Sequence, residues 1–453
     1  MCEIGKDSLS ALAFVIGHEL THFFYGHQHP SFGFATSQSR LNNSNKDIEK
    51  EADLYGLIHG FSSGYQTFKV AKTILEKIYR VYELRDSSLN YPTKKQRINS
   101  IVGQIQRAQQ LASTFEVGKF LYLNRQYGVA AHCFADLCTQ LPTKEFLTNL
   151  GLAQLQQVLV SDWTKSHFMP FKLPVELEAE NRLLDTNREG ISDKSNESEK
   201  LLESSIKNFE KAIALDYHYL PAHINLATAL LLHNRYGTVK DQLDLLEKNI
   251  KPFPPDAYLL RGIALLSPRL KDYEAAQADF DKANGAFEIE YNRKIAALLR
   301  NGVIDKENTD WIKNDLFTSS SIIRATPVGI EKNMGGLSFP LPESLSIGYK
   351  HYLPTPNLVH YEYSESNGLH MYKIQLEDSK FHVIQGYTQA PNLSTAQGIK
   401  IGDPIERVTN KYSSPSRKVL IGNGYFYCYD NAHIYFKIQN NTVAGWIIYQ
   451  KTM

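Results

Sequence analysis

The residues with the clearest chemical potential lie near the start of the chain, in the stretch GHELTHFFYGH at residues 17–27. His18 and His22 are four residues apart, so on a helix both imidazoles lie on one face and can bind one metal ion. Two neutral imidazoles suit zinc. Glu19 is rotated by about 100° from His18 on such a helix, within reach of a zinc-bound water but badly placed as a ligand. The pattern predicts zinc-assisted hydrolysis with Glu19 as the general base.

A third ligand is expected in the stretch EKEADLYG, about 30 residues further along the chain. Glu49 and Asp53 are four residues apart, so both face one side of a second helix. Glu49 would complete a His-His-Glu site for one zinc ion per chain and leave the fourth position to water. Asp53 would accept the free ring N–H of a ligating histidine. Glu51 points away from both and is expected to be solvated.

These side chains need helices to position them. Asp7-Ser8 can cap a first helix, in which apolar residues from Leu9 to Phe23 follow a three-four spacing. A second helix is expected to begin near Asp47 and a third to cover about residues 68–84. The intervening tract HQHPSFGFATSQSRLNNSNK is rich in Ser, Asn, Gly and Pro and is expected to be a loop that contains His29.

Taken together, HELTHFFYGH, EKEADLYG and YPTKKQRI resemble the gluzincin metalloprotease family that contains the HtpX heat-shock protease, the CAAX prenyl proteases and the periplasmic protease BepA. The resemblance covers roughly residues 7–105. It implies His18, His22 and Glu49 as zinc ligands, Glu19 as base and Asp53 in support. His27 matches a histidine often found after the second ligand and is not expected to bind zinc. In YPTKKQRI, Tyr91 stands in place of the usual histidine, while Pro92, Arg97 and Ile98 match.

Two points stay open at this stage. Arg97 can orient the active site or a substrate carbonyl, or it can form a structural ion pair. The family also carries an upstream segment with an edge strand that pairs with extended substrate, and this chain lacks it. We therefore expect an N-terminally truncated protease domain. The alternative to a protease is a non-catalytic scaffold or chaperone on a degenerate or truncated protease domain.

From about residue 113 a repeat of alternating small and aromatic residues indicates tetratricopeptide (TPR) units. Pro221 and Pro255 open successive units 34 residues apart, which is the TPR period. One unit is split by a polar insertion at about residues 161–198. Each helix pair has a face that it cannot bury alone, so the pairs must stack. Such an array is expected to bind a protein substrate or partner.

The last part of the chain changes to β-type patterns, including HMYKIQL, KFHVIQGY, YFYCYD and HIYFKIQNNTVAGWIIYQ. Asn440-Asn441 between two alternating runs predicts a hairpin. Gly402-Asp403-Pro404 predicts the start of one amphipathic helix. This order resembles small periplasmic domains of the outer-membrane-assembly lipoprotein type, and a targeting or docking module is expected.

Composition sets the frame for these elements. The chain has 453 residues, 49 Lys+Arg and 48 Asp+Glu, so its net charge of +1 gives no electrostatic case for binding nucleic acid. No apolar run is long enough for a transmembrane helix. No signal peptide is visible, and a periplasmic or envelope location with a role in protein quality control follows only from the resemblance.

We expect an α+β multidomain fold. Its parts are a helical zincin-type protease domain at 1–110, TPR repeats at 111–300, a linker at 301–340 and a β-rich accessory domain at 341–453.

Overall fold

The computed structural model describes most residues of the chain. They are residues 7–24, 45–62, 65–81, 93–161, 170–180, 197–302, 333–334, 337–338, 350–352, 359–366, 369–387 and 394–452. The chain divides into two compact units. One comprises Met1–Glu116 with Glu180–Asp185, and the other comprises Val117–Ala179 with Thr186–Met453.

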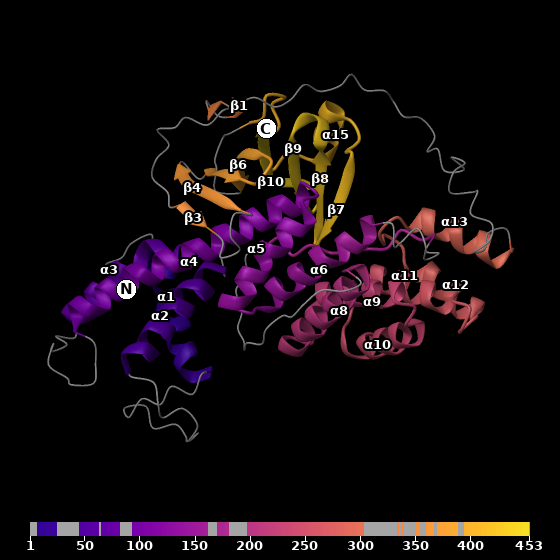
Figure 1. The fold of residues 1–453 in the computed structure, drawn as a ribbon, viewed down its shortest axis with the longest axis horizontal. Helices are drawn as coiled ribbons and strands as arrows, with labels where there is room; N and C mark the ends of the chain where they lie inside the picture. Colours follow the sequence, from indigo (N-terminus) through magenta and orange to yellow (C-terminus); the bar gives the residue numbers. More distant parts are fainter. Residues whose placement is uncertain are drawn as a thin grey trace. The chain divides into compact units, whose positions relative to one another are not determined.

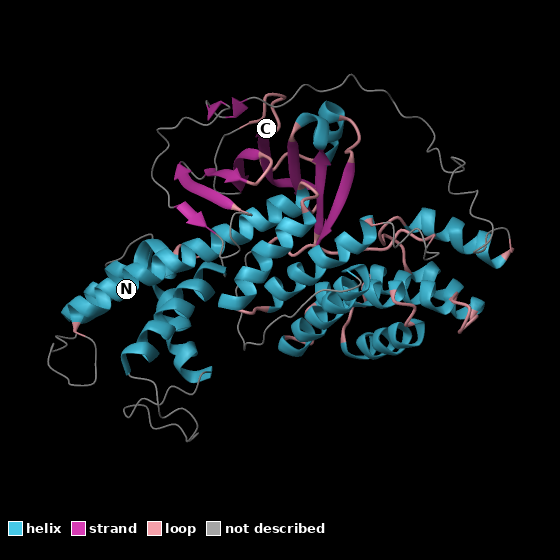
Figure 2. Ribbon diagram, in the orientation of Figure 1, coloured by secondary structure: helices cyan, strands magenta, loops and turns pink. Residues whose placement is uncertain are grey.

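The described chain is helical as far as Arg300, and strands dominate the remainder, so the expected α+β composition is confirmed (Figure 1; Figure 2). The helices are α1 (Ser8–Phe24), α2 (Asn45–Ser62), α3 (Thr67–Val81), α4 (Lys94–Leu123), α5 (Tyr127–Gln140), α6 (Lys144–Val160), α8 (Glu197–Leu215), α9 (Leu220–Leu232), α10 (Tyr236–Asn249), α11 (Pro255–Leu265), α12 (Tyr273–Lys282), α13 (Ile289–Arg300) and α15 (Ile405–Tyr412).

Local sequence signals explain several helix starts. The Thr143 hydroxyl accepts the backbone N–H of Phe146 at 3.2 Å and caps α6, and Asp272 caps α12 in the same way. Pro221 and Pro255 stand in the first turn of α9 and α11, where a missing N–H costs nothing. The two prolines therefore open alternate helices of a series in which α8, α9, α10 and α11 each pack against the next.

The strands are β1 (Asn333–Met334), β2 (Leu337–Ser338), β3 (Lys350–Tyr352), β4 (His360–Ser366), β5 (Leu369–Gln375), β6 (Lys380–Tyr387), β7 (Arg417–Ile421), β8 (Gly424–Tyr429), β9 (Ile434–Gln439) and β10 (Thr442–Thr452). The last eight form one antiparallel sheet in the order β3-β4-β5-β6-β10-β9-β8-β7.

Two predictions for this part are confirmed. Asn440 and Asn441 connect β9 to β10, both with positive φ (49° and 59°), the conformation of a two-residue hairpin turn. The helix α15 begins directly after Pro404.

The central strands β9 and β10 are buried on both faces, which explains their nearly continuous apolar runs. Trp446 and Phe436 pack on one face with Val408 and Tyr412 of α15. The opposite face carries Phe381, Tyr435 and Tyr449. The ring of Phe120 in α4 lies 5.4 Å from that of Phe381 and 5.5 Å from that of Tyr449, and Asn124 donates to the Tyr435 hydroxyl at 3.0 Å. Side chains of alternate residues in one strand are therefore both buried.

One predicted domain boundary and two predicted segments can be located in the structure. The boundary between residues 110 and 111 falls within α4, which is continuous over 30 residues. The segment 170–180, inside the predicted insertion, is ordered against the helices. Most of the predicted linker, residues 303–332, lies outside the described residues, as do His27, His29, Tyr91 and Pro92.

Candidate metal centre

The histidine pair lies on the face of α1 that packs against α2. His18 is buried and His22 is half-buried. The two helices approach closely because each has a glycine at the contact. A Cβ added to Gly56 of α2 would lie 2.8 Å from the backbone N of His18 and 2.9 Å from the carbonyl oxygen of Phe14. Only glycine fits there, and the short distance between the backbones brings the carboxylates of α2 to the imidazoles of α1.

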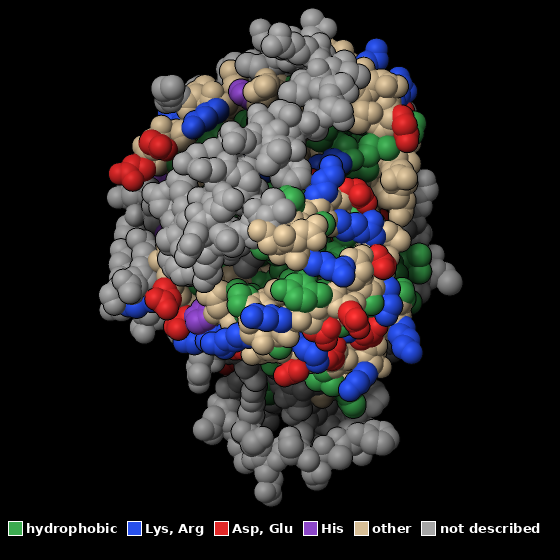
Figure 3. Space-filling model, turned by 90° about the vertical axis from the view of Figure 1, so that its right-hand side faces the viewer, with side chains coloured by type: hydrophobic (Ala, Val, Ile, Leu, Met, Phe, Trp, Pro, Cys, Tyr) green, Lys and Arg blue, Asp and Glu red, His purple; other side chains and the backbone are tan. Residues whose placement is uncertain are grey.

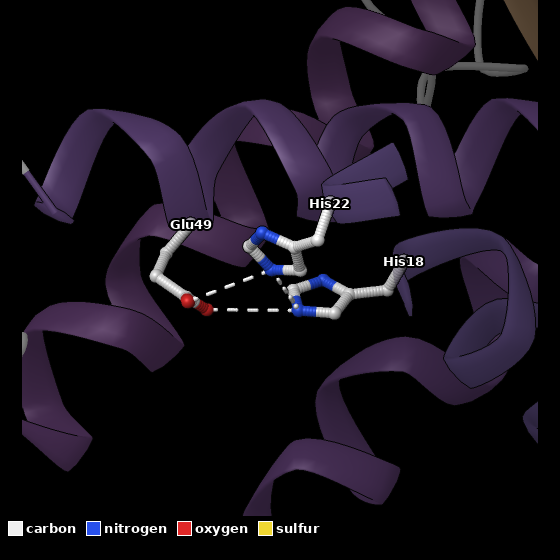
Figure 4. Close-up of side chains that lie close together, drawn as sticks. All are labelled: His18, His22 and Glu49. Carbon is white, nitrogen blue, oxygen red and sulfur yellow. Dashed lines mark hydrogen bonds and ion pairs between the residues drawn. The ribbon is translucent and has the colours of Figure 1, made fainter. Parts of the chain in front are cut away.

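Three donor groups converge at this contact (Figure 4). The Nε2 atoms of His18 and His22 are 3.0 Å apart, and each lies 3.6 Å from an oxygen of Glu49. The ligand atoms of a tetrahedral zinc centre, with bonds of about 2.0–2.1 Å, lie about 3.3 Å apart. The separations of 3.0 and 3.6 Å bracket that value, and the donor set of two imidazoles and one carboxylate suits zinc. The two 3.6 Å distances are to different oxygens of Glu49, and the three residues together form a group that could hold a metal ion.

Behind His18 lies a buried carboxylate. Asp53 is 1 % exposed, and its Oδ1 lies 3.0 Å from the Nδ1 of His18. With its proton on Nδ1 facing Asp53, His18 would direct its Nε2 lone pair toward His22 and Glu49, and an NH2 group of Arg97 also lies 3.3 Å from that Nε2. Burial alone raises the pKa of Asp53, but His18 and Arg97 outweigh burial, and the pKa of Asp53 is lowered. Asp53 is consequently an anion that orients a ligand-type histidine.

Arg97, in the first turn of α4, balances the two buried carboxylates. Its Nε and one NH2 group form a fork with Asp53 at 3.2 and 2.9 Å, and its other NH2 group lies 2.5 Å from Glu49. Burial alone lowers the pKa of Arg97, but Asp53 and Glu49 raise that pKa by more than burial lowers it. The pKa of Arg97 is therefore raised, and the guanidinium stays charged. Of the two roles left open by the sequence, this geometry favours the ion pair, since the guanidinium is engaged by carboxylates.

Glu19 has a different environment from the ligand-type residues. It is exposed on α1, one residue after His18, while Leu12, Ile16 and Leu20 expose 40–48 % of their surface on the neighbouring part of the helix. Its carboxylate is thus accessible to solvent, as a base that exchanges protons with water requires. Glu51, expected to be solvated, is half-buried.

Sequence reasoning missed two residues of this region. Gly56 sets the distance between α1 and α2. Tyr79 of α3 is 8 % exposed and hydrogen-bonds to Arg97; burial raises its pKa, as does Glu49, while Arg97 lowers it. The spacing of Gly17 and Gly56 against the histidines and acids was the available signal for the first, but no local pattern marks the second.

The comparisons with known proteins supply no family. No protein-family model matches the chain, and no curated protein matches it.

Within the described residues, no helix has the length and apolar character needed to cross a bilayer. Acidic and basic side chains are interspersed on the described surface shown in Figure 3, in keeping with the net charge of +1.

Proposed function

We propose that the chain is a zinc-dependent endopeptidase that acts on protein or peptide substrates. The observation that carries this proposal is the convergence of His18, His22 and Glu49 within 3.0–3.6 Å of one another, next to an exposed Glu19. A purely structural helix contact has no need for two imidazole nitrogens and a carboxylate at this spacing. A hydrolytic metal site needs all of them.

Each residue of the site would have a distinct role. His18, His22 and Glu49 would hold the ion, which when bound would polarise the scissile carbonyl and acidify a water. The carboxylate of Glu19 would take a proton from the attacking water and deliver it to the leaving amine nitrogen. Asp53 would keep the proton of His18 on Nδ1. Arg97 would hold Asp53 and Glu49 in place.

The wider assignment rests on the gluzincin resemblance and on the helix pairs. We infer that α9 with α10, and α11 with α12, are TPR units, since their prolines recur at 34 residues and the pairs stack in order. The stack would bind a protein substrate or partner. A place in envelope protein quality control belongs to the same proposal.

The test combines zinc analysis of the purified chain with cleavage of casein or a quenched-fluorescence peptide. Glu19→Gln is expected to keep one zinc per chain and to lose at least about 10²-fold in rate, because it removes the base but no ligand. His22→Ala and Glu49→Ala are expected to lose zinc. Glu76→Gln on the exposed side of α3 is the matched control for the charge change and should have no effect.

Two results would count against this assignment. Full zinc occupancy in Glu49→Ala would remove Glu49 from the ligand set. Zinc binding without cleavage in wild type and Glu19→Gln alike would favour the second candidate, a non-catalytic scaffold or chaperone. That candidate is supported by the ordered contacts that the helix stack makes with an extended segment.

A further inference from the structure

A segment of the chain, residues 170–179 (PFKLPVELEA), lies across α6, α9 and α13. We refer to it as the docked segment. Three asparagines hold it, one from each helix. Each donates its side-chain NH2 to the carbonyl of one segment residue and accepts the N–H of that same residue: Asn149 binds Glu178 at 3.0 and 3.0 Å, Asn225 binds Glu176 at 2.8 and 2.7 Å, and Asn292 binds Lys172 at 2.9 and 2.9 Å.

The contacts follow the geometry of an extended strand. In a strand, alternate residues direct their N–H and C=O to the same side. The residues bound by asparagine are 172, 176 and 178, all on one side. Leu177, between the last two, directs its N–H to the opposite side and donates it to the carbonyl of Leu420 in β7 at 2.9 Å. The asparagine side chains of the helices thus hydrogen-bond to the backbone of residues on one side of the strand.

Residue 174 strengthens this interpretation. It is proline, which has a carbonyl but no N–H to donate. The helix side chain that faces it is Thr228, one turn after Asn225, whose hydroxyl donates to the Pro174 carbonyl at 2.6 Å. The Thr228 hydroxyl, which acts as a donor, therefore faces Pro174, where the backbone of the segment offers only an acceptor. We call Asn149, Asn225, Thr228 and Asn292 the asparagine face.

The buried polar groups of the asparagine face are matched by the docked segment. Asn149, Asn225, Thr228 and Asn292 are all fully buried. They are buried with the segment in place, and the backbone groups of the segment are the hydrogen-bond partners of their side chains. One side-chain requirement accompanies the backbone contacts: the Tyr219 hydroxyl donates to the Glu178 carboxylate at 2.8 Å.

We propose that the asparagine face is a binding site for an extended polypeptide strand, that its natural ligand is an unfolded segment of a protein bearing an acceptor side chain opposite Tyr219, and that the docked segment occupies the site in cis. The ligand displaces the docked segment and takes over its backbone hydrogen bonds. The site lies within the second unit and needs neither zinc nor hydrolysis, so it stands or falls independently of the proposed peptidase activity.

The first test uses a fluorescein-labelled peptide with the sequence of residues 170–179. In wild type the tethered segment competes at an effective concentration of the order of millimolar, so the peptide should bind weakly. The double variant Glu176→Pro, Glu178→Pro removes both N–H groups given to asparagine and should bind the peptide at least ~10-fold more tightly in fluorescence anisotropy. Val175→Pro, which changes a residue of the other side of the strand, is the matched control and should behave as wild type. Adding Asn225→Ala to the double variant should abolish the gain.

A folded double variant, judged by circular dichroism, that binds no better than wild type would overturn the proposal, as would a gain that survives Asn225→Ala. The second test needs no variant and covers the case in which the double variant does not fold. Hydrogen exchange of the wild-type chain should show the amides of Glu176 and Glu178 opening without the helix amides of α9. Exchange of those two amides only together with α9 would show a permanent structural strand and would refute a displaceable one.

Discussion

The glycine contact between α1 and α2 yields the most direct prediction about the metal centre. In Gly56→Ala, the new Cβ would lie 2.8 Å from the His18 backbone N, whereas ordinary contacts begin at 3.4 Å, so the helices must separate by about 0.6 Å (3.4 minus 2.8). The obstructing atoms are backbone and cannot rotate away. Metal sites tolerate about 0.2 Å in ligand distance, so this displacement exceeds the tolerance about threefold. We expect zinc affinity to fall at least ~10-fold.

Stability should respond less than zinc affinity, because two effects oppose each other. Overpacking costs roughly 1–3 kcal/mol, while replacing glycine by alanine within a helix returns about 1 kcal/mol. Gly103→Ala in α4 is the matched control: nothing lies within 4 Å of its new Cβ, so zinc binding should be unchanged. The assay is competition for zinc with a chromophoric chelator, alongside thermal unfolding. Equal zinc affinity in Gly56→Ala and wild type would refute the reasoning that the glycine contact sets the donor distances.

Three further predictions concern buried charge. Asp53→Asn should weaken zinc binding about 10–100-fold in the same chelator competition, since it removes the anion that holds the His18 proton on Nδ1; unchanged affinity would exclude that role. Arg97→Ala leaves Asp53 and Glu49 buried without their cation and should cost about 3–5 kcal/mol of unfolding free energy in urea, a loss that added zinc partly reverses. The thermal stability of wild type should fall relative to that of Glu176→Gln between about pH 5 and pH 8, and parallel pH profiles of the two chains would contradict this.

The sign of the pH effect follows from burial. Burial, together with Glu178 and Asp256, raises the pKa of Glu176 from 4.5 to about 8. Glu145 behaves alike: burial raises its pKa to about 8, although Lys144 and Thr143 lower it and Glu178 raises it. The folded chain thus keeps protons that the unfolded chain releases. The stability contribution of each carboxyl is full below about pH 4.5 and declines by up to about 1.4 kcal/mol per pH unit until about pH 8.

Sequence reasoning succeeds where the determinants are local. His18 and His22 share a face because of the helical repeat, and Asn440-Asn441 form a hairpin because both tolerate positive φ. For α4, the change from one pattern to another near residue 110 predicted a domain boundary. The helix is continuous there, and the division of the chain into two compact units falls within the same helix, between Glu116 and Val117.

The features that could not be predicted from the sequence depend on contacts between residues far apart in the chain. The partner of Asn225 is 49 residues away and that of Asn292 is 120 residues away, and both bind backbone, which has no signature in the sequence. The polar insertion therefore gave no sign that part of it is an ordered strand. Likewise Tyr79 reaches Arg97 from another helix, and no spacing rule connects the two.

The asparagine face also determines how the docked segment can change over generations. Because the helices bind peptide groups rather than side chains, most substitutions in residues 170–179 preserve the contacts with asparagine. Proline is the exception, since it is harmless at 174, where only a carbonyl is used, and harmful at 172, 176 and 178, where the N–H is given away. The hydrogen bonds of the segment thus fix where proline is permitted: position 174 admits it, whereas positions 172, 176, 177 and 178 each give an N–H to a neighbour.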